Sequence, residues 1–201
     1  MSAVSENIVR EFFEQQGCFV RQQRKFVGKE DDEIDFLVIN PRFQASPEPL
    51  PFELDTTDVE RLDRAVVSVR GWHTETFTPG LLAATPELFR FVEADALRQA
   101  GQLFGEGNAP LRIMAVPGLP PDRDSREQST ALLRSRGIDA VLPFRVMLGA
   151  LLNGVETNRN YQKSDLLQIL RLLKLYGFTR DAQLELFGMD RRRLAVRPRK
   201  K

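Results

Sequence analysis

The residues with the clearest potential for chemistry lie beside two short apolar segments. Asp35 lies in residues 32–40, a stretch with the composition of a buried strand and with carboxylates at its entry. The second run, residues 65–70, ends in Arg70, and the only histidine, His73, follows shortly after. A carboxylate at the start of a strand either pairs with a neighbouring cation or binds a metal ion. The sequence leaves both roles open.

Most other chemistries are excluded by residue type or spacing. The chain has one histidine and one cysteine, Cys18, so an intrachain disulfide or a Cys-cluster zinc site cannot form. It contains no Gly-x-x-x-x-Gly-Lys-Ser/Thr phosphate loop, no Gly-x-Ser-x-Gly elbow and no His-Glu-x-x-His motif. We expect Cys18 to be a small buried hydrophobe and His73 to have a structural or hydrogen-bonding role.

The N-terminal half predicts a helix followed by strands. Apolar residues recur at helical spacing in residues 5–16. Strands are expected at 18–27 and 32–40, and a third strand at 65–70 is so apolar that it should be buried on both faces. The proline-rich residues 41–58 separate the second and third strands. They should form a surface loop or flap that cannot join a sheet.

The next part of the chain predicts a parallel crossover. After a loop at residues 74–85, a helix should begin at Thr85-Pro86 and continue to Ala100. A strand at 111–116 is followed by a helix that begins at Asp124 or Ser125 and ends at Gly137, and then by a strand at 138–144. Strand, helix, strand is typical of two parallel strands joined by a helical connection. A doubly wound nucleotide-binding fold is the main alternative, since residues 111–144 alone would fit it.

The C-terminal third is expected to be helical. A short apolar helix is predicted at residues 145–152, and a stronger helical pattern covers residues 164–176, with Ser164 as its cap. The apolar residues of this second helix cover more than one face. We therefore expect it to pack against more than one neighbour, which could include a second subunit.

This order of elements resembles that of the PD-(D/E)xK, or restriction-endonuclease-like, superfamily. The resemblance covers about residues 5–144 and rests on the element order, on Glu33-Ile34-Asp35 and on Val67-Ser68-Val69-Arg70. It implies an α/β fold with a mixed central sheet flanked by helices. The expected organisation is that domain over residues 1–152, a C-terminal helical extension over 153–188 and a disordered basic tail over 189–201.

The resemblance also implies a site. In active members, an Asp on the second strand and an acidic-x-Lys motif on the third bind a divalent cation and position a water. Oxygen ligands of this kind suit Mg²⁺, which stabilises charge on the scissile phosphate. Asp35 matches that Asp, whereas Ser68 stands at the acidic position and Arg70 at the lysine position.

These replacements alter the expected chemistry. Ser68 supplies no negative charge, and Arg70 can hold a phosphate but stays protonated and cannot act as a base. An active enzyme would need a relocated carboxylate. Glu93 on the following helix would then join Asp35 as a metal ligand, with Glu75 and Glu11 as further candidates.

Basic residues supply the candidate nucleic-acid contacts. They lie on the first strand and in the tail: Arg21, Arg24, Lys25, Arg191, Arg192 and Arg193. The last thirteen residues hold seven basic residues and one acidic residue, which suits salt-dependent contact with phosphates. The same residues could instead protect an edge strand from aggregation or solvate a terminus.

Three functions remain open from the sequence. The first is a nuclease-like domain that has lost standard catalysis and binds nucleic acid or a protein partner. The second is an active Mg²⁺-dependent nuclease, and the third is a scaffold or homodimer formed through the helix at 164–176. No apolar run approaches the ~20 residues that span a bilayer and no secretory signal is evident, so we expect a cytoplasmic protein without a membrane partner.

Overall fold

The computed structural model describes residues 3–23 and 34–179. The chain divides into two compact units, residues 1–154 and residues 155–201. Within the described ranges, no helix combines the length and apolar character needed to cross a membrane.

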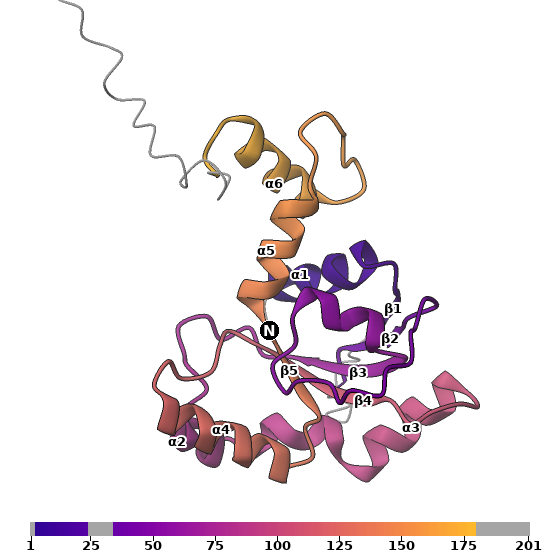
Figure 1. Ribbon diagram of the computed structural model, residues 1–201, viewed down its shortest axis with the longest axis vertical. Coiled ribbons are helices and arrows are strands. Elements are labelled where there is room, and N and C mark those ends of the chain that lie inside the picture. Colours follow the sequence, from indigo (N-terminus) through magenta and orange to yellow (C-terminus); the bar gives the residue numbers. More distant parts are fainter. Residues whose placement is uncertain (1–2, 24–33, 180–201) are drawn as a thin grey trace, which may run out of the picture. The chain divides into compact units, whose positions relative to one another are not determined.

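The first unit is built on a five-stranded mixed sheet in which spatial order follows chain order (Figure 1). Its strands are β1 (Phe19–Gln22), β2 (Phe36–Ile39), β3 (Arg64–Val69), β4 (Leu111–Val116) and β5 (Ala140–Pro143). The pairs β1–β2 and β2–β3 are antiparallel, whereas β3–β4 and β4–β5 are parallel. This arrangement confirms an α/β class with a mixed sheet and a parallel strand–helix–strand crossover.

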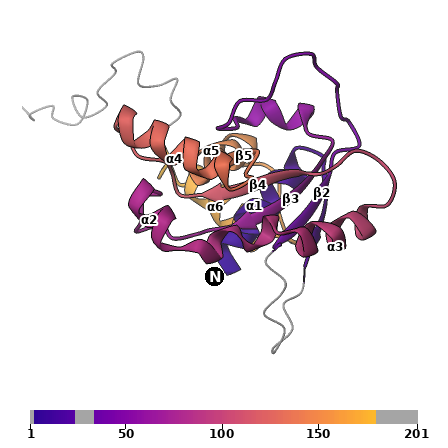
Figure 2. The same cartoon turned by 90° about the horizontal axis from the view of Figure 1, so that it is seen from below.

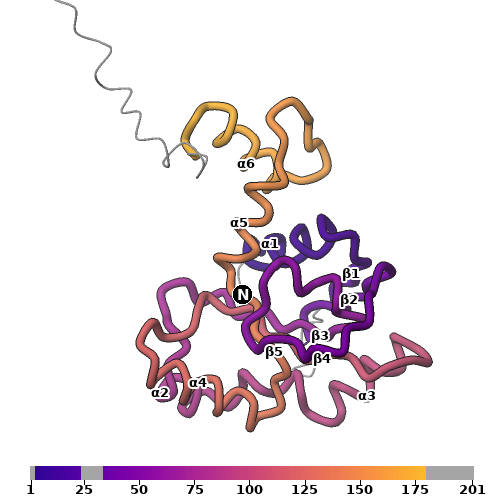
Figure 3. Tube along the Cα trace, in the orientation of Figure 1, coloured from indigo at the N-terminus to yellow at the C-terminus, as the bar shows by residue number. Residues whose placement is uncertain are grey.

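Helices cover both faces of this sheet (Figure 2). On one face lie α1 (Ala3–Gln15) and α5 (Phe144–Gly154), which contact each other. On the other face lie α2 (Pro79–Ala84), the 3₁₀ helix η2 (Pro86–Val92), α3 (Ala94–Phe104) and α4 (Arg123–Ser135). A second 3₁₀ helix, η1 (Thr56–Arg61), follows the proline-rich segment. The path of the chain through these layers is traced in Figure 3.

The alternation of side chains along the strands separates two apolar clusters. Leu37, Val66 and Met114 point to the face covered by α2, η2, α3 and α4, where they join a cluster with Phe77 and Leu88. The residues that alternate with these along each strand point to the other face, toward α1 and α5. The central strand β3 is buried along Ala65–Val69, as its apolar sequence predicts.

Three expectations for individual elements are wrong. The predicted helix from Thr85 to Ala100 is two helices, because Glu93 has an extended backbone (ψ 153°) that separates η2 from α3. The predicted loop at 74–85 contains α2, with Thr78 as its cap and Pro79 in its first turn. The helix expected to begin at Asp124 or Ser125 is capped instead by Asp122, whose carboxylate accepts the Ser125 N–H at 2.9 Å.

The proline-rich segment also behaves differently from the expectation that it cannot join a sheet. Its proline-containing part is a surface loop, but the residues directly after Pro51 lie along β5. Val141 N–H donates to the Phe52 carbonyl at 2.7 Å, and Leu54 N–H donates to the Val141 carbonyl at 2.9 Å. Proline blocks pairing only at its own N–H, so the chain can pair again as soon as the prolines end.

In the second unit, residues 155–179 are described and form a loop followed by α6 (Asp165–Leu175). Ser164 caps the helix, as expected, by accepting the Leu167 N–H at 3.3 Å. Polar side chains of α6 hold the loop, for example through the Arg171 Nε–H, which donates to the Thr157 carbonyl at 3.0 Å. No residue of α6 is buried, although its apolar residues predicted packing on more than one side.

Candidate functional site

The structure brings Asp35, Ser68 and Arg70 together. In the antiparallel pair β2–β3, Phe36 lies opposite Val67, so Asp35 lies opposite Ser68 one position further along. Arg70 follows two residues later and therefore points to the same face of the sheet as Ser68. That is the face covered by η2, whose Leu88 carbonyl lies 3.5 Å from the Arg70 Nη2.

Asp35 is held by donors from β3. Its Oδ2 accepts the Val69 N–H at 2.7 Å and lies 3.5 Å from the Ser68 hydroxyl. The Arg70 guanidinium is 3.9 Å from the same oxygen. Exposed fractions are 2% for Asp35, 0% for Ser68 and 6% for Arg70, so this buried cluster is closed to solvent. We call these three residues the Asp35 cluster.

The Asp35 cluster does not fit a Mg²⁺ ion. A magnesium ion needs oxygen ligands and retains several waters, whereas the Asp35 cluster is dry and places a guanidinium against the carboxylate. Across residues 3–23 and 34–179, no group of three His, Cys, Asp or Glu side chains is arranged to hold a metal ion. The cluster instead has the geometry of a buried ion pair.

The proposed replacement carboxylates do not complete the site. Glu93 is an exposed residue between η2 and α3, and Glu75 is exposed in the loop after β3. Glu11 is buried, but it belongs to α1 on the opposite face and lies 3.4 Å from Arg10. The structure therefore gives Asp35 no carboxylate partner among these candidates.

The single histidine has a structural setting. His73 Nε2 is 3.2 Å from the Ser5 hydroxyl of α1, and its ring meets the edge of Phe144 with centroids 4.7 Å apart. Gly71 permits this approach, since a Cβ there would lie 2.2 Å from the Ser5 hydroxyl oxygen. These contacts join α1 and α5 to the segment after β3, as expected for a hydrogen-bonding role.

The predicted nucleic-acid residues are only partly described. Arg24, Lys25, Arg191, Arg192 and Arg193 lie outside the described residues. Arg21 is exposed on β1 and lines a hollow with mostly apolar walls. Among the described residues, its neighbours in this hollow are mostly hydrophobic side chains.

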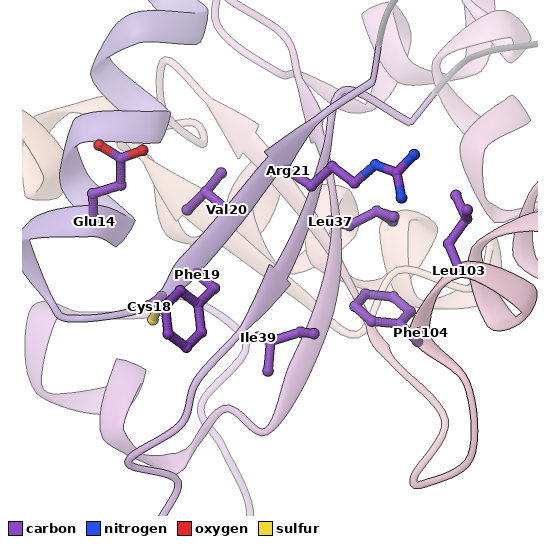
Figure 4. A pocket seen from close by; sticks show the side chains of 9 residues that line it. All are labelled: Glu14, Cys18, Phe19, Val20, Arg21, Leu37, Ile39, Leu103 and Phe104. Carbon is purple, nitrogen blue, oxygen red and sulfur yellow. The ribbon is translucent and has the colours of Figure 1, made fainter.

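That hollow is the feature that the sequence did not reveal. It has a volume of about 390 Å³ and runs along β1, with walls from the end of α1, from β1 and β2, and from the end of α3 (Figure 4). On the α3 side its lining is Phe19, Arg21, Leu37, Ile39, Leu103 and Phe104. On the α1 side it includes Glu14, Cys18 and Val20. We call it the β1 groove.

Two titratable groups line the α1 side of the β1 groove. Burial raises the pKa of the Cys18 thiol to about 11, which makes it a poor nucleophile and excludes a thiolate at neutral pH. Burial also raises the pKa of the Glu14 carboxyl, and the nearby Glu11 adds to this effect while Arg10 opposes it. The groove therefore offers apolar surface with little reactive chemistry.

A partial signal for the β1 groove exists in the sequence. Phe19 and Arg21 alternate on the first strand, and Leu103-Phe104 directly precede a glycine at the end of a helix. An apolar pair at a helix end is ordinary by itself. Only the fold brings these four distant wall segments together.

Comparisons with known proteins were made at the level of sequence families and of structure. No protein-family model, no curated protein and no solved structure matches the chain. The functional inference therefore rests on the geometry of the Asp35 cluster and of the exposed surfaces.

Proposed function

We propose that the chain is a restriction-endonuclease-like domain without phosphodiesterase activity that works by binding a protein partner. The observation that carries this proposal is the burial of the Asp35 cluster, which occupies the positions where the superfamily has its catalytic residues. The order helix, strand, strand, strand, helix, strand, with an Asp opposite the third strand, supports the superfamily part of the proposal.

The energetics of the Asp35 cluster favour a structural role. Removing one partner of a buried ion pair leaves the other charge without compensation, which typically costs about 3–5 kcal/mol. Here the carboxylate also accepts a backbone N–H of β3, and the guanidinium reaches a carbonyl of η2. The cluster thus ties two strands to the helix above them, and a residue used in this way is not available for substrate.

Exposed apolar side chains support a protein partner over nucleic acid. On the first unit, Phe19 is 69% exposed and Leu103 is 45% exposed, and both line the β1 groove. Phosphate recognition uses rows of basic side chains. Arg21 is the one predicted phosphate contact within the described ranges, and it has apolar neighbours in the groove.

A cleavage assay tests the absence of activity. Supercoiled plasmid and single-stranded DNA are incubated with the full chain and Mg²⁺ or Mn²⁺, and Asp35→Ala and Asp35→Asn are run in parallel. We expect no cleavage by any of the three proteins, and a loss of about 3 kcal/mol of unfolding free energy in Asp35→Ala. Cleavage by the wild type that is lost in Asp35→Asn, with the circular dichroism spectrum retained, would show an active nuclease.

The variant Glu93→Gln tests whether Glu93 serves as the second metal ligand. Glu93 is exposed, so Glu93→Gln should leave stability within about 0.5 kcal/mol of the wild type. If the wild type cleaves DNA and this variant does not, Glu93 is a metal ligand and the proposal fails.

Nucleic-acid binding is tested by salt dependence. Binding of labelled duplex and single-stranded DNA is measured between 50 and 200 mM salt for the full chain and for residues 1–188. We expect no specific binding of DNA by either protein. Binding that weakens steeply with salt and disappears in the shorter chain would assign the function to the basic residues of 189–201.

A homo-oligomeric scaffold is a second candidate, and one observation favours it. Helix α6 presents Ile169, Leu172, Leu173 and Tyr176 at helical spacing, with exposed fractions of 55%, 37%, 37% and 71%. If this face forms a dimer, Ile169→Glu should convert it to a monomer in light scattering. The matched control Gln162→Glu, at an exposed polar position of the same unit, should not.

A further inference from the structure

The outer side of β1 has backbone groups that point away from the sheet. In the described part of the chain, β1 pairs with β2 alone. Gln23 N–H donates to the Asp35 carbonyl at 2.9 Å, which sets the alternation of the antiparallel ladder. Every second residue from Gln23 therefore directs its N–H and C=O groups toward β2, which includes Arg21 and Phe19. The N–H and C=O groups of Val20 and Gln22 point outward, away from the sheet.

The β1 groove lies along this same edge and receives side chains from both faces of the strand. On one face, Arg21 extends toward Leu103 of α3, and Phe19 lies beside Ile39 (Figure 4). On the other face, Val20 points into it beside Glu14 of α1 (Figure 4). A strand added beside β1 would place its own alternate side chains against each of these walls in turn.

We propose that β1 binds, by strand addition, an extended segment of a partner protein that carries an acidic residue two positions from an apolar residue. The outward groups of Val20 and Gln22 supply main-chain hydrogen bonds, and the groove walls select side chains. The acidic residue faces Arg21, and the apolar residue faces Phe19 and Ile39. This inference rests on the proposed function and specifies the partner that it requires.

Charge complementarity is the reason for an acidic segment. Arg21 is exposed and forms no salt bridge within residues 3–23 and 34–179. The rest of its wall, formed by Phe19, Leu37, Ile39, Leu103 and Phe104, is apolar. Among the described residues of this wall Arg21 is the one cation, and one guanidinium with apolar neighbours favours a single carboxylate over a chain of phosphates, which needs several cations.

The same argument disfavours a second copy of this chain as the occupant. A β1 strand from another copy would bring Phe19 and Arg21 to this wall, with no acidic residue between Cys18 and Gln23. In a pairing centred on Arg21, two arginines would lie opposite each other, and like charges at directly opposite positions destabilise a strand pair. A foreign acidic segment avoids this repulsion.

The test uses the full chain and a defined probe. The probe is a fluorescein-labelled ten-residue peptide in which valine alternates with threonine and one central valine is replaced by glutamate. A second peptide has lysine at that position. We expect saturable binding of the glutamate peptide in fluorescence anisotropy, about tenfold weaker binding of the lysine peptide, and reversal of this preference in Arg21→Glu. The matched control Arg98→Glu, an exposed arginine of α3 outside the groove, should change nothing.

Backbone pairing is tested on the peptide, so that the folding of the protein is not affected. N-methylation of the amides on one edge of the peptide should abolish binding, whereas methylation of the alternate amides should leave it within about twofold, since only one edge faces β1. Failure of all peptides to bind at 1 mM, or equal binding of both methylated forms, would overturn the proposal. A homodimer that Val20→Pro converts to a monomer would also overturn it, by making a second copy the occupant.

These results are distinct from those that test the proposed function. The anisotropy and methylation readouts depend on β1 alone, whereas failure of the proposed function would be seen as cleavage of DNA that depends on Asp35. A protein that neither cleaves DNA nor binds the peptides would refute the strand-addition inference and leave the absence of catalysis in place.

Discussion

The two edges of the sheet differ in how their backbone groups are used. At the β5 edge, residues 52–54 lie along the strand and pair with both the N–H and the C=O of Val141. The side chains of Phe52 and Leu54 are buried there, with exposed fractions of 7% and 2%. At the β1 edge, no described segment pairs with the strand, and Phe19 is 69% exposed. One edge belongs to the core, and the other presents surface.

The two edges therefore differ in whether a partner can bind there without disturbing the fold. An open sheet edge is a template for pairing with other chains, and proteins generally cover or charge such edges. Here residues 52–54 cover one edge, whereas among the described residues the other edge carries one basic side chain, Arg21. The contrast makes β1 the edge at which a change should alter binding, and β5 the edge at which a change should alter stability.

Proline substitution at matched edge positions should give the largest effect. Val141→Pro removes an N–H that donates to the Phe52 carbonyl, so we expect a loss of about 3 kcal/mol or more of unfolding free energy. The N–H of Val20 points outward, and Val20→Pro should cost less than about 1 kcal/mol. Urea unfolding followed by fluorescence of the single tryptophan, Trp72, measures both. Similar losses in the two variants would show that β1 is paired on its outer side.

Truncation of the aromatic residue at each edge should give the next largest difference. Phe52 is buried and lies under the guanidinium of Arg134, which is 4.9 Å from the ring centroid. Phe52→Ala should lower the unfolding free energy by about 3 kcal/mol, in the range of buried aromatic truncations. Phe19→Ala should change it by less than about 0.5 kcal/mol and should weaken peptide binding instead. An equal loss of unfolding free energy in both variants would show that the two edges do not differ in their contribution to stability.

Breaking the ion pair at the covered edge should have a smaller effect. Arg126 of α4 forms a bidentate pair with Glu53, with its Nε 2.7 Å from Oε1, at partial exposure. Arg126→Gln should cost about 0.5–1 kcal/mol, and high salt should reduce this difference. Arg98→Gln, which breaks the exposed pair with Asp95, is the control and should cost almost nothing. A larger loss in the control would argue against any special role for Glu53.

The smallest effect concerns pH at the open edge. Because burial raises the pKa of Glu14 in the folded protein, the folded state binds its proton more tightly than the unfolded state does. This contribution to stability is fully present below the ordinary pKa of 4.5 and is lost as the pH rises through the raised value. Glu14→Gln should remove that part of the pH dependence in thermal unfolding scans started below pH 4.5. An unchanged pH profile would show that Glu14 is well solvated.

Much of the fold could be predicted because local pattern and tertiary environment agree. The helix at 5–16, the succession of strands along the chain and the crossover through 111–144 follow from apolar periodicity and capping residues, and the structure confirms them. The break at Glu93 could not be predicted in this way. Leu88, Phe89 and Phe91 are all buried in one apolar cluster, and they belong to a 3₁₀ helix that the extended backbone of Glu93 separates from α3. A continuous apolar pattern does not reveal such a break.

The candidate site was less predictable for a physical reason. Sequence spacing places Asp35, Ser68 and Arg70 on one face, and the structure shows them adjacent. Whether that face is open depends on η2, which lies across it and comes from a segment about twenty residues further along the chain. The β1 groove depends on four such segments. The residue pattern of a single strand does not indicate which helix or loop will cover its face.

The strand order has a consequence for how the molecule is assembled. Because each strand pairs with its predecessor in the chain, no strand must insert between two that are already in place. The connection between β1 and β2 is the shortest, and the connection between β3 and β4, residues 70–110, is the longest. Contacts that close long connections form more slowly than local ones. During synthesis the sheet can therefore grow from the N-terminal side, strand by strand. Residues 52–54 leave the ribosome long before β5 does, so their pairing with Val141 completes the sheet late in folding.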